Sequence, residues 1–586
     1  MSIHGYNRTS SRAGGRGPQR EVGLVGLLWA SETSIIGSGW LPGALGAATL
    51  AGPSAILSWL IASVIIIILA LVHAELGGLF PVTGGTSRFP HYAFGSFAGA
   101  TFGWFSYLQA AAVAPIEVEA VIQYLAVIPG AGVGGLFNNK GVLSWEYGIP
   151  LAVVLVIICT YMNLVGIRWL AKTNNAITTW KVLIPVLAVF IFLLFKFHGG
   201  NFGGGHAGPF FVKGAAVKTL FQAMPAAGII FSLLGFEQAV QLGGESANPQ
   251  RDLPRAVIGS ILIGAAIYVL VQIAFIAALK PSVLASGGGW QGIPGHVTNA
   301  TIHSLTAAPF ATLAAVGGLA WLAWIFRVDA FISPGGTALM YLTSASRISF
   351  GLSKNGYVPE VFERTSTEKI PVFAVLFSAA LGLLFLLPFP SWFALVAVVT
   401  SASVMMYAAA PLSLGALRRS KPDLPRSYRL PAGEIVAPIA FVFANLVVYF
   451  SGWGTYSALM AFMVIGAILI GLSFTFHLNQ HQPRLDWNAA PWVLTYLVGM
   501  GVISFVGAFP GAPGLYVPKG VGLFNGIFGL NHTLVGGKGT ILPFWWSMLV
   551  VIIFSLLIYA WAISTRMPSD KVDEYVRDVY PPPLAE

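Results

Sequence analysis

Long apolar runs recur along most of this chain of 586 residues. A run of about 20 apolar residues is long enough to cross the hydrocarbon core of a membrane as an α-helix. In the whole sequence 56% of residues are hydrophobic and only 9% are charged, and the mean hydropathy is +0.77. A soluble protein this apolar could not cover its surface with polar groups. We therefore predict an all-α polytopic membrane protein.

The apolar runs divide into about fourteen membrane spans. The single cysteine, Cys159, lies inside one of them and excludes both an intramolecular disulfide and a multi-cysteine metal site. The predicted spans are 22–49, 53–79, 96–126, 149–165, 174–197, 217–243, 254–279, 308–345, 371–388, 390–417, 435–452, 457–476, 491–509 and 542–564.

Most of the 31 lysine and arginine residues fall in alternate connections, on the same side as the N-terminus. Because basic loops stay in the cytoplasm, this bias predicts that both termini are cytoplasmic in a multi-pass protein of the inner, or plasma, membrane. It also explains the net charge of +10 without a nucleic-acid partner. We predict cytoplasmic tails over 1–21, a disordered segment, and over 565–586, which is similar to it.

Glycines interrupt two of the apolar helices near the middle of the membrane. The first span reads Ile35-Ile36-Gly37-Ser38-Gly39-Trp40, and the sixth reads Ser232-Leu233-Leu234-Gly235-Phe236-Glu237. Glycine inside a helix costs roughly 1 kcal/mol relative to alanine. A broken helix at membrane depth is tolerated where it lines a cavity. Interruptions five spans apart indicate a substrate site between two repeats, although small residues also allow close helix packing.

Several short segments resemble the amino acid–polyamine–organocation permeases, in order and spacing, over roughly residues 20–420. The Ile116-Glu117-Val118-Glu119-Ala120 run and the span number look most like the bacterial aspartate:proton symporter branch. The other matching segments are Gly37-Ser38-Gly39, Ala74-Glu75-Leu76, Phe80-Pro81-Val82-Thr83-Gly84-Gly85, Gly235-Phe236-Glu237, Asn248-Pro249-Gln250-Arg251-Asp252-Leu253-Pro254, Ser346-Arg347 and Asn355-Gly356-Tyr357-Val358-Pro359.

This resemblance implies an inverted five-helix repeat, the LeuT-like fold, in which helices 1 and 6 are broken. The ten-helix core would cover 22–417, with one repeat over about 22–197 and the other over about 217–417. Four additional transmembrane helices within 418–564 would be peripheral. The longest connections, near 280–307 and 510–541, would hold short helices or loops outside the membrane.

The resemblance also implies a binding site for an amino acid. Backbone N–H groups and the positive helix end of the first break would hold the substrate carboxylate, and carbonyl groups at the second break would hold its amine. Phe236 matches the family's aromatic lid, although a packing aromatic is an equal interpretation. The carboxylate cradle would be Ile36, Gly37, Ser38 and Gly39, and the amine acceptors would surround Phe231, Ser232 and Gly235.

Charged residues inside the spans are candidates for energy coupling, because each is costly to bury. Lys181 matches a lysine that proton-coupled relatives carry in the fifth span, where sodium-coupled relatives hold the ion. By gaining and losing a proton it could switch the contact between the first and eighth spans, unless it reaches the membrane interface instead. Glu237 could carry a proton or bridge to the eighth or tenth span.

Two further pairs of charges lie two residues apart and must face different sides of their helices. In the third span, one of Glu117 and Glu119 could line the path while the other pairs with Arg327. We take Glu119 as the coupling candidate. Arg327 and Asp329 in the eighth span share this spacing, and a buried structural ion pair is the alternative for all four. Glu75 is interpreted as structural.

These features favour a secondary active transporter that imports amino acids, with the proton as coupling ion and no cofactor or metal. The sequence holds no HExxH, GxSxG or Walker motif, which argues against an enzyme or a primary pump. An amino acid or amine exchanger and a transporter-like nutrient receptor stay open. Aspartate or glutamate would use Arg327, cationic substrates would use Glu119, Glu237 or Asp329, and neutral amino acids would need no charge.

Overall fold

The computed structural model describes residues 21–130, 135–138, 142–165, 167–366, 370–386, 392–509 and 541–577, with the backbone alone for 167–174. In these residues the chain forms helices joined by loops, and its β-structure is limited to isolated bridges. The all-α prediction is confirmed. The predicted tail over 1–21 and the connection 510–541 lie almost wholly outside the described residues.

Each predicted span coincides with a helix or an interrupted helix. The first seven helices are α1 (Leu24–Ile35), α2 (Trp40–Ala51), α3 (Ala55–Leu79), α4 (Gly85–Phe94), α5 (Ser96–Ala126), α6 (Gly148–Val165) and α7 (Ile167–Phe195). The next ten are α8 (Ala216–Ala226), α9 (Ile229–Ser232), α10 (Glu237–Gln241), α11 (Pro249–Ala278), α12 (Pro281–Ser286), α13 (Ala300–Ala307), α14 (Pro309–Val316), α15 (Ala320–Lys354), α16 (Val372–Leu386) and α17 (Trp392–Ser420). The last are α18 (Gly433–Phe450), α19 (Gly452–Thr475), α20 (Ala490–Val506), α23 (Phe544–Ser564) and α24 (Ser569–Tyr575).

Within the described residues, ten helices are long and apolar enough to cross a membrane, counting Trp40–Leu79 once. The predicted number, about fourteen, is larger than ten because four of the predicted spans are not counted separately. The first span merges with the second in this count, and the sixth is broken into α8, α9 and α10. The ninth span, α16, has only 15 residues and is too short to be counted. The eighth span contains α15, which is long enough but too polar to be counted.

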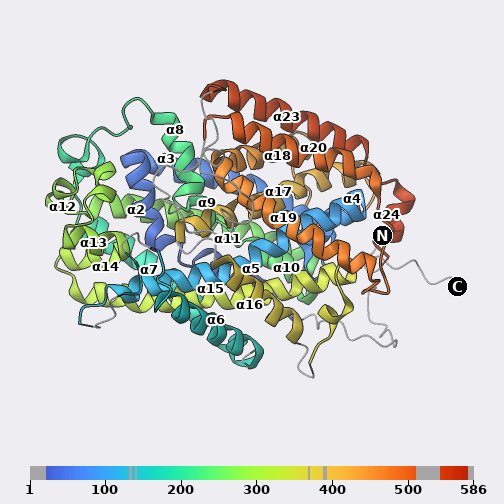
Figure 1. Cartoon of the computed structure of the whole chain (residues 1–586), viewed down its shortest axis with the longest axis horizontal. Coiled ribbons are helices and arrows are strands. Elements are labelled where there is room, and N and C mark those ends of the chain that lie inside the picture. The colour runs from blue at the N-terminus through green and yellow to red at the C-terminus, as the bar shows by residue number, and fades with distance from the viewer. Residues whose placement is uncertain are drawn as a thin grey trace, which may run out of the picture.

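The two halves of the core are arranged in opposite directions along the molecule. Short helices follow the second span of each half, and they lie at opposite ends of the molecule: α4 at one end, α12, α13 and α14 at the other (Figure 1). The second and third spans of one half also pack along their counterparts, α3 on α11 and α5 on α15. This arrangement is that of an inverted repeat, as predicted.

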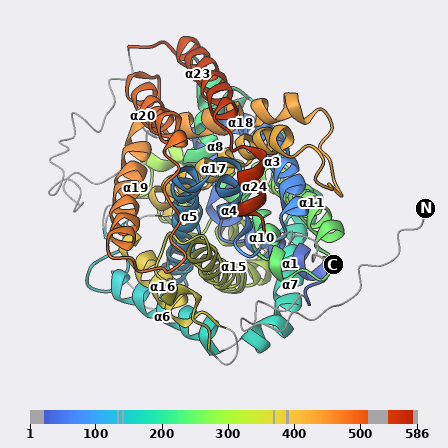
Figure 2. The same ribbon diagram turned by 90° about the vertical axis from the view of Figure 1, so that its right-hand side faces the viewer.

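The last four spans cover one flank of the core. In the end-on view, α19, α20, α23 and α18 follow one another along one side (Figure 2). They reach the core through α18 on α17 and α3, and through α19 on α5 and α17. None of these four helices contains a residue of either break.

Two segments differ from the prediction. The eighth span was predicted as 308–345, but Gly317 and Gly318 separate α14 from α15, and Gly318 has a positive φ of 80° that favours glycine. In the C-terminal segment, which was predicted to resemble the disordered N-terminal tail, Ser569–Tyr575 form α24, which packs on α4. The Tyr575 hydroxyl donates a hydrogen bond to Asp486 Oδ2 (2.8 Å), which holds this segment in place.

Candidate substrate site

The first break lies between Ile35 and Trp40, where α1 ends and α2 begins. The N–H groups of Ile36 and Gly37 donate to the nearby carbonyl groups of Glu32 (2.9 Å) and Ile35 (3.1 Å). The next N–H, that of Ser38, donates instead to the carboxylate of Glu117 on α5, with an N–Oε2 distance of 2.7 Å. A buried carboxylate therefore already occupies part of the predicted cradle.

The second break lies between α9 and α10, over residues 233–236. Gly235 has a φ of 126°, which side chains other than glycine rarely adopt. Its N–H donates to Glu237 Oε2 at 2.8 Å, so a carboxylate two residues further along binds this break. The Phe231 carbonyl accepts from Leu234 (3.1 Å). The Gly235 carbonyl accepts from Gln238 (3.0 Å), so of the three predicted acceptor residues Ser232 is the one whose carbonyl has no hydrogen bond from the described residues.

The two breaks touch each other at two points. A Cβ atom on Gly39 would collide with the side chain of Ser232. A Cβ atom on Gly235 would lie 2.6 Å from the backbone nitrogen of Ile35 and 2.8 Å from the carbonyl carbon of Ser34. The glycines are needed here because the backbones of two helices meet without room for side chains. The predicted cradle and the predicted amine acceptors are thus brought together.

Aromatic rings surround the breaks. Trp392, the first described residue of α17, donates from Nε1 to the Ser38 hydroxyl (3.0 Å). Its ring meets that of Phe231 with centroids 5.8 Å apart. Phe236 packs against Tyr407 (4.8 Å) and His73 instead. Sequence reasoning missed Trp392, because one aromatic residue gives no separate signal in a chain with 13% aromatic residues.

Lys181 lies beside the first break and is fully buried. Its Nζ donates to the carbonyl oxygen of Thr33 on α1 and to the hydroxyl of Thr337 on α15 at 2.7 Å. The Thr337 hydroxyl also bonds the Thr33 carbonyl at 2.8 Å. One ammonium therefore connects the first, fifth and eighth spans, the contact that the family resemblance implied. Its side chain therefore points into the protein and does not extend to the outer surface.

Three buried carboxyl groups surround this ammonium. The acidic residues near Lys181 are Glu117 on α5, Asp329 on α15 and Glu32 on α1. Asp329 accepts from Trp180 Nε1 (2.9 Å) and the Ser333 hydroxyl (2.7 Å). Neither carboxylate oxygen of Glu32 has a hydrogen-bond partner among the described residues. Glu32 was missed by sequence reasoning, although an acidic residue five positions before Gly37 was the available signal.

Glu237 is held by two tyrosines from the second half of the core. Tyr407 on α17 donates to Oε2 at 2.6 Å, and Tyr341 on α15 donates to Oε1 at 3.3 Å. The sequence left open a bridge to the eighth or the tenth span, and the structure shows contacts to both. Its role in carrying a proton stays a prediction.

The two glutamates of α5 face different sides, as their spacing predicted. Glu119 lies beside the Trp392 backbone, at the start of α17. Neither of its oxygens accepts a hydrogen bond from the residues described. The expected pairing of one glutamate with Arg327 is wrong, since the Arg327 guanidinium lies over the ring of Trp324 (4.9 Å), toward the outside of α15. Arg327 therefore does not reach the breaks.

Packed aromatic residues close the space between the breaks from both ends. On the side of α14, Trp40 packs against Phe310 (4.5 Å) and Phe326 (5.7 Å). On the side of α4, Tyr407 packs against Phe236 and, at 5.2 Å, His73. Within the described residues, an aromatic layer therefore lies on each side of the breaks.

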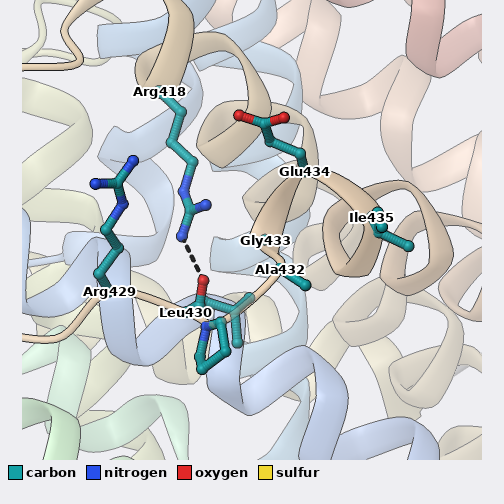
Figure 3. Close-up of a pocket in the computed structure, with 8 residues that line it drawn as sticks. Arg418, Arg429, Leu430, Ala432, Gly433, Glu434 and Ile435 are labelled. Atoms are coloured by element: carbon teal, nitrogen blue, oxygen red, sulfur yellow. Dashed lines mark hydrogen bonds between the residues drawn. The ribbon is translucent and has the colours of Figure 1, made fainter.

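A separate hollow of about 380 Å³ lies at the start of α18 and contains no residue of either break (Figure 3). In it, Arg418 reaches the Leu430 carbonyl (2.8 Å). The same guanidinium binds Glu75 (Nε–Oε1 3.0 Å, Nη2–Oε2 2.5 Å), to which Arg426 also binds at 3.0 Å. This network joins the end of α3 to the end of α17, in agreement with a structural role for Glu75.

A sequence profile described as "Amino acid permease" matches residues 22–453. The chain belongs to the amino acid permease family. The family lies within the amino acid–polyamine–organocation superfamily, so the resemblance found in the motifs is confirmed. This permease is a multi-pass membrane transporter for amino acids and not an enzyme.

Two similar proteins cover nearly the same length as this permease. It is 33% identical to the "Glutamate/serine transporter AimA" of Bacillus subtilis, over 95% of each chain. It is 30% identical to the "Aspartate-proton symporter" of the same organism, over 95% of this chain and 98% of the relative. The "Branched-chain amino acid permease BcaP" of B. subtilis is 25% identical, over 81% of this chain and 97% of the relative.

Proposed function

We propose that this permease imports amino acids across the cytoplasmic membrane by proton symport, with both termini in the cytoplasm. The observation that carries the proposal is the position of Lys181, whose Nζ connects Thr33 at the first break to Thr337 on α15. Loss of its proton would remove the positive charge that these two oxygens bind. The contact between the first and eighth spans would then weaken, and the balance between two conformations would shift.

The charge balance around Lys181 supports coupling to protons. One ammonium and three carboxyl groups, all buried, would carry a net negative charge if all were ionised. Uncompensated charges of this kind are costly to bury. A neutral cluster therefore requires some carboxyl groups to hold protons, and such groups can exchange them when either layer opens.

The proposed substrates are acidic amino acids, aspartate or glutamate, with serine as the neutral comparison. The names of the two relatives of 30% and 33% identity support this choice, since one is called an aspartate-proton symporter and the other a glutamate/serine transporter. The backbone groups of the breaks suit the α-carboxylate and amine that all three amino acids share. The position of Arg327 gives no support for recognition of a second carboxylate there.

The test is uptake into proteoliposomes that contain the purified permease. Labelled aspartate, glutamate and serine are supplied with a pH gradient, acid outside, and then without one. We expect accumulation of at least one of them above the external concentration, lost on addition of a protonophore. Uptake that requires an amino acid inside and ignores the gradient would identify an exchanger. Binding without accumulation would identify a receptor.

A further inference from the structure

The first break already binds a carboxylate that belongs to the protein itself. Glu117 reaches the Ser38 N–H from α5, and the residue is 1% exposed. Its other oxygen, Oε1, accepts no hydrogen bond from the described residues. This oxygen would lie 2.8 Å from a Cβ atom on Gly37, so it points along the break. An amino acid that places its carboxylate on these N–H groups must take the space that Glu117 fills.

A second carboxylate cannot simply be added beside the first. Lys181 lies near Glu117, and it already has Glu32 and Asp329 as acidic neighbours. In a buried site, like charges this close repel strongly. Binding is therefore favourable only when Glu117 leaves the Ser38 N–H and becomes neutral.

We propose that Glu117 is an internal stand-in for the substrate carboxylate, displaced from the Ser38 N–H by an arriving amino acid and neutralised by one proton. The proton comes from water and joins a Glu117 oxygen. One carboxylate replaces another, so the net charge around Lys181 stays the same. This inference rests on the proposed function, and it identifies the step at which substrate and proton are linked.

The groups that face Glu117 fit this exchange. The ammonium of Lys181 on α7 attracts a carboxylate at the Ser38 N–H, whether it belongs to Glu117 or to the substrate. Tyr268 and Tyr341 add neutral hydroxyl groups nearby. The titratable groups that interact with Glu117 or share its ammonium are Lys181 (α7), Tyr268 (α11), Tyr341 (α15), Glu32 (α1) and Asp329 (α15).

Binding of labelled aspartate, glutamate and serine is measured on the full-length permease in detergent, from about pH 5.5 to about pH 8.5. For the unmodified protein we expect the affinity to fall by about tenfold per pH unit in the upper part of this range, as linkage to one proton requires. Glu117→Gln cannot ionise, so its affinity should change less than about twofold and stay close to the value at low pH. Glu434→Gln, an exposed carboxylate on α18, is the matched control.

Proton uptake in weakly buffered solution is a second measurement, made on the unmodified permease and on Glu117→Gln. We expect about one proton taken up per amino acid bound by the unmodified permease, and close to none by Glu117→Gln. Unchanged pH dependence in a folded Glu117→Gln protein, or its loss in Glu119→Gln instead, overturns the inference. Binding without proton uptake by the unmodified permease overturns it too, while leaving amino acid transport intact. Failure to bind any amino acid at any pH contradicts the proposed function itself.

Discussion

In both breaks of the core a backbone N–H donates to a buried carboxylate, but the two carboxylates are held differently. At the second break, Glu237 binds an N–H only two residues away and is fixed by Tyr341 and Tyr407. At the first break, the carboxylate comes from Glu117 on another helix, 79 residues from Ser38 along the chain. One of the Glu117 oxygens has no hydrogen-bond partner among the described residues.

This difference indicates that Glu237 is a fixed part of the structure, whereas Glu117 can be replaced by another carboxylate. Hydrogen bonds from two tyrosines on two helices make Glu237 part of the frame of the second break. Glu117 binds a backbone N–H of the first break that could equally bind another carboxylate. The nearby ammonium of Lys181 can balance the charge of Glu117 or of a substrate carboxylate. We infer that the second break keeps its geometry while the first exchanges its ligand. The predictions below test this contrast, starting with the largest effect.

Gly39→Leu should abolish substrate binding. The side chain would collide with Ser232, and the two breaks could no longer touch. Binding of labelled amino acids to purified protein is the measurement, with membrane insertion checked by yield and by a single peak in gel filtration. Gly471→Leu on α19 is the matched control, since nothing lies within 4 Å of a Cβ atom there. Normal affinity in Gly39→Leu would remove the first break from the binding site.

Lys181→Ala should retain some binding but lose accumulation driven by a pH gradient. The alanine removes the ammonium that connects Thr33 to Thr337, and with it the difference between conformations that the proton controls. Lys181→Arg should fail as well, because arginine keeps its proton. Lys196→Ala, just beyond the end of α7, is the control. A Lys181→Ala protein that still concentrates substrate under a pH gradient alone would contradict the coupling role of Lys181 and leave Glu117 or Glu237 to couple transport to the proton.

The sequence predicted the spans and both breaks because length, hydropathy and glycine position are local properties. It also placed Lys181 in the correct contact, through the resemblance to a family. It could not predict that Glu117 reaches Ser38, since that contact depends on the packing of α5 across the first helix. The same reason explains the wrong pairing of Arg327, because spacing shows that two residues face different sides but not which neighbour each side meets.

Tyr407→Phe should reduce stability while leaving coupling in place. It removes one buried hydroxyl that donates to Glu237 at 2.6 Å, and a lost hydrogen bond of this kind costs about 1 kcal/mol. Unfolding in mixed micelles measures the free energy. Tyr456→Phe, which removes a buried hydroxyl bound to the Leu497 carbonyl (2.6 Å) far from the breaks, should cost a similar amount. Loss of proton uptake in Tyr407→Phe alone would mean that Glu237, and not Glu117, exchanges the proton.

The smallest expected effect concerns Trp392, which touches both breaks. Trp392→Phe keeps a ring against Phe231 but loses the hydrogen bond from Nε1 to the Ser38 hydroxyl. An interhelical hydrogen bond in a membrane protein is worth roughly 0.6 kcal/mol, which corresponds to about a threefold weaker affinity. The backbone N–H of Ser38 is unaffected, so the pH dependence of binding should be that of the unmodified protein. Trp545→Phe on the exposed face of α23 is the control. A loss well beyond tenfold would show that the indole, and not the backbone of the first break, holds the substrate.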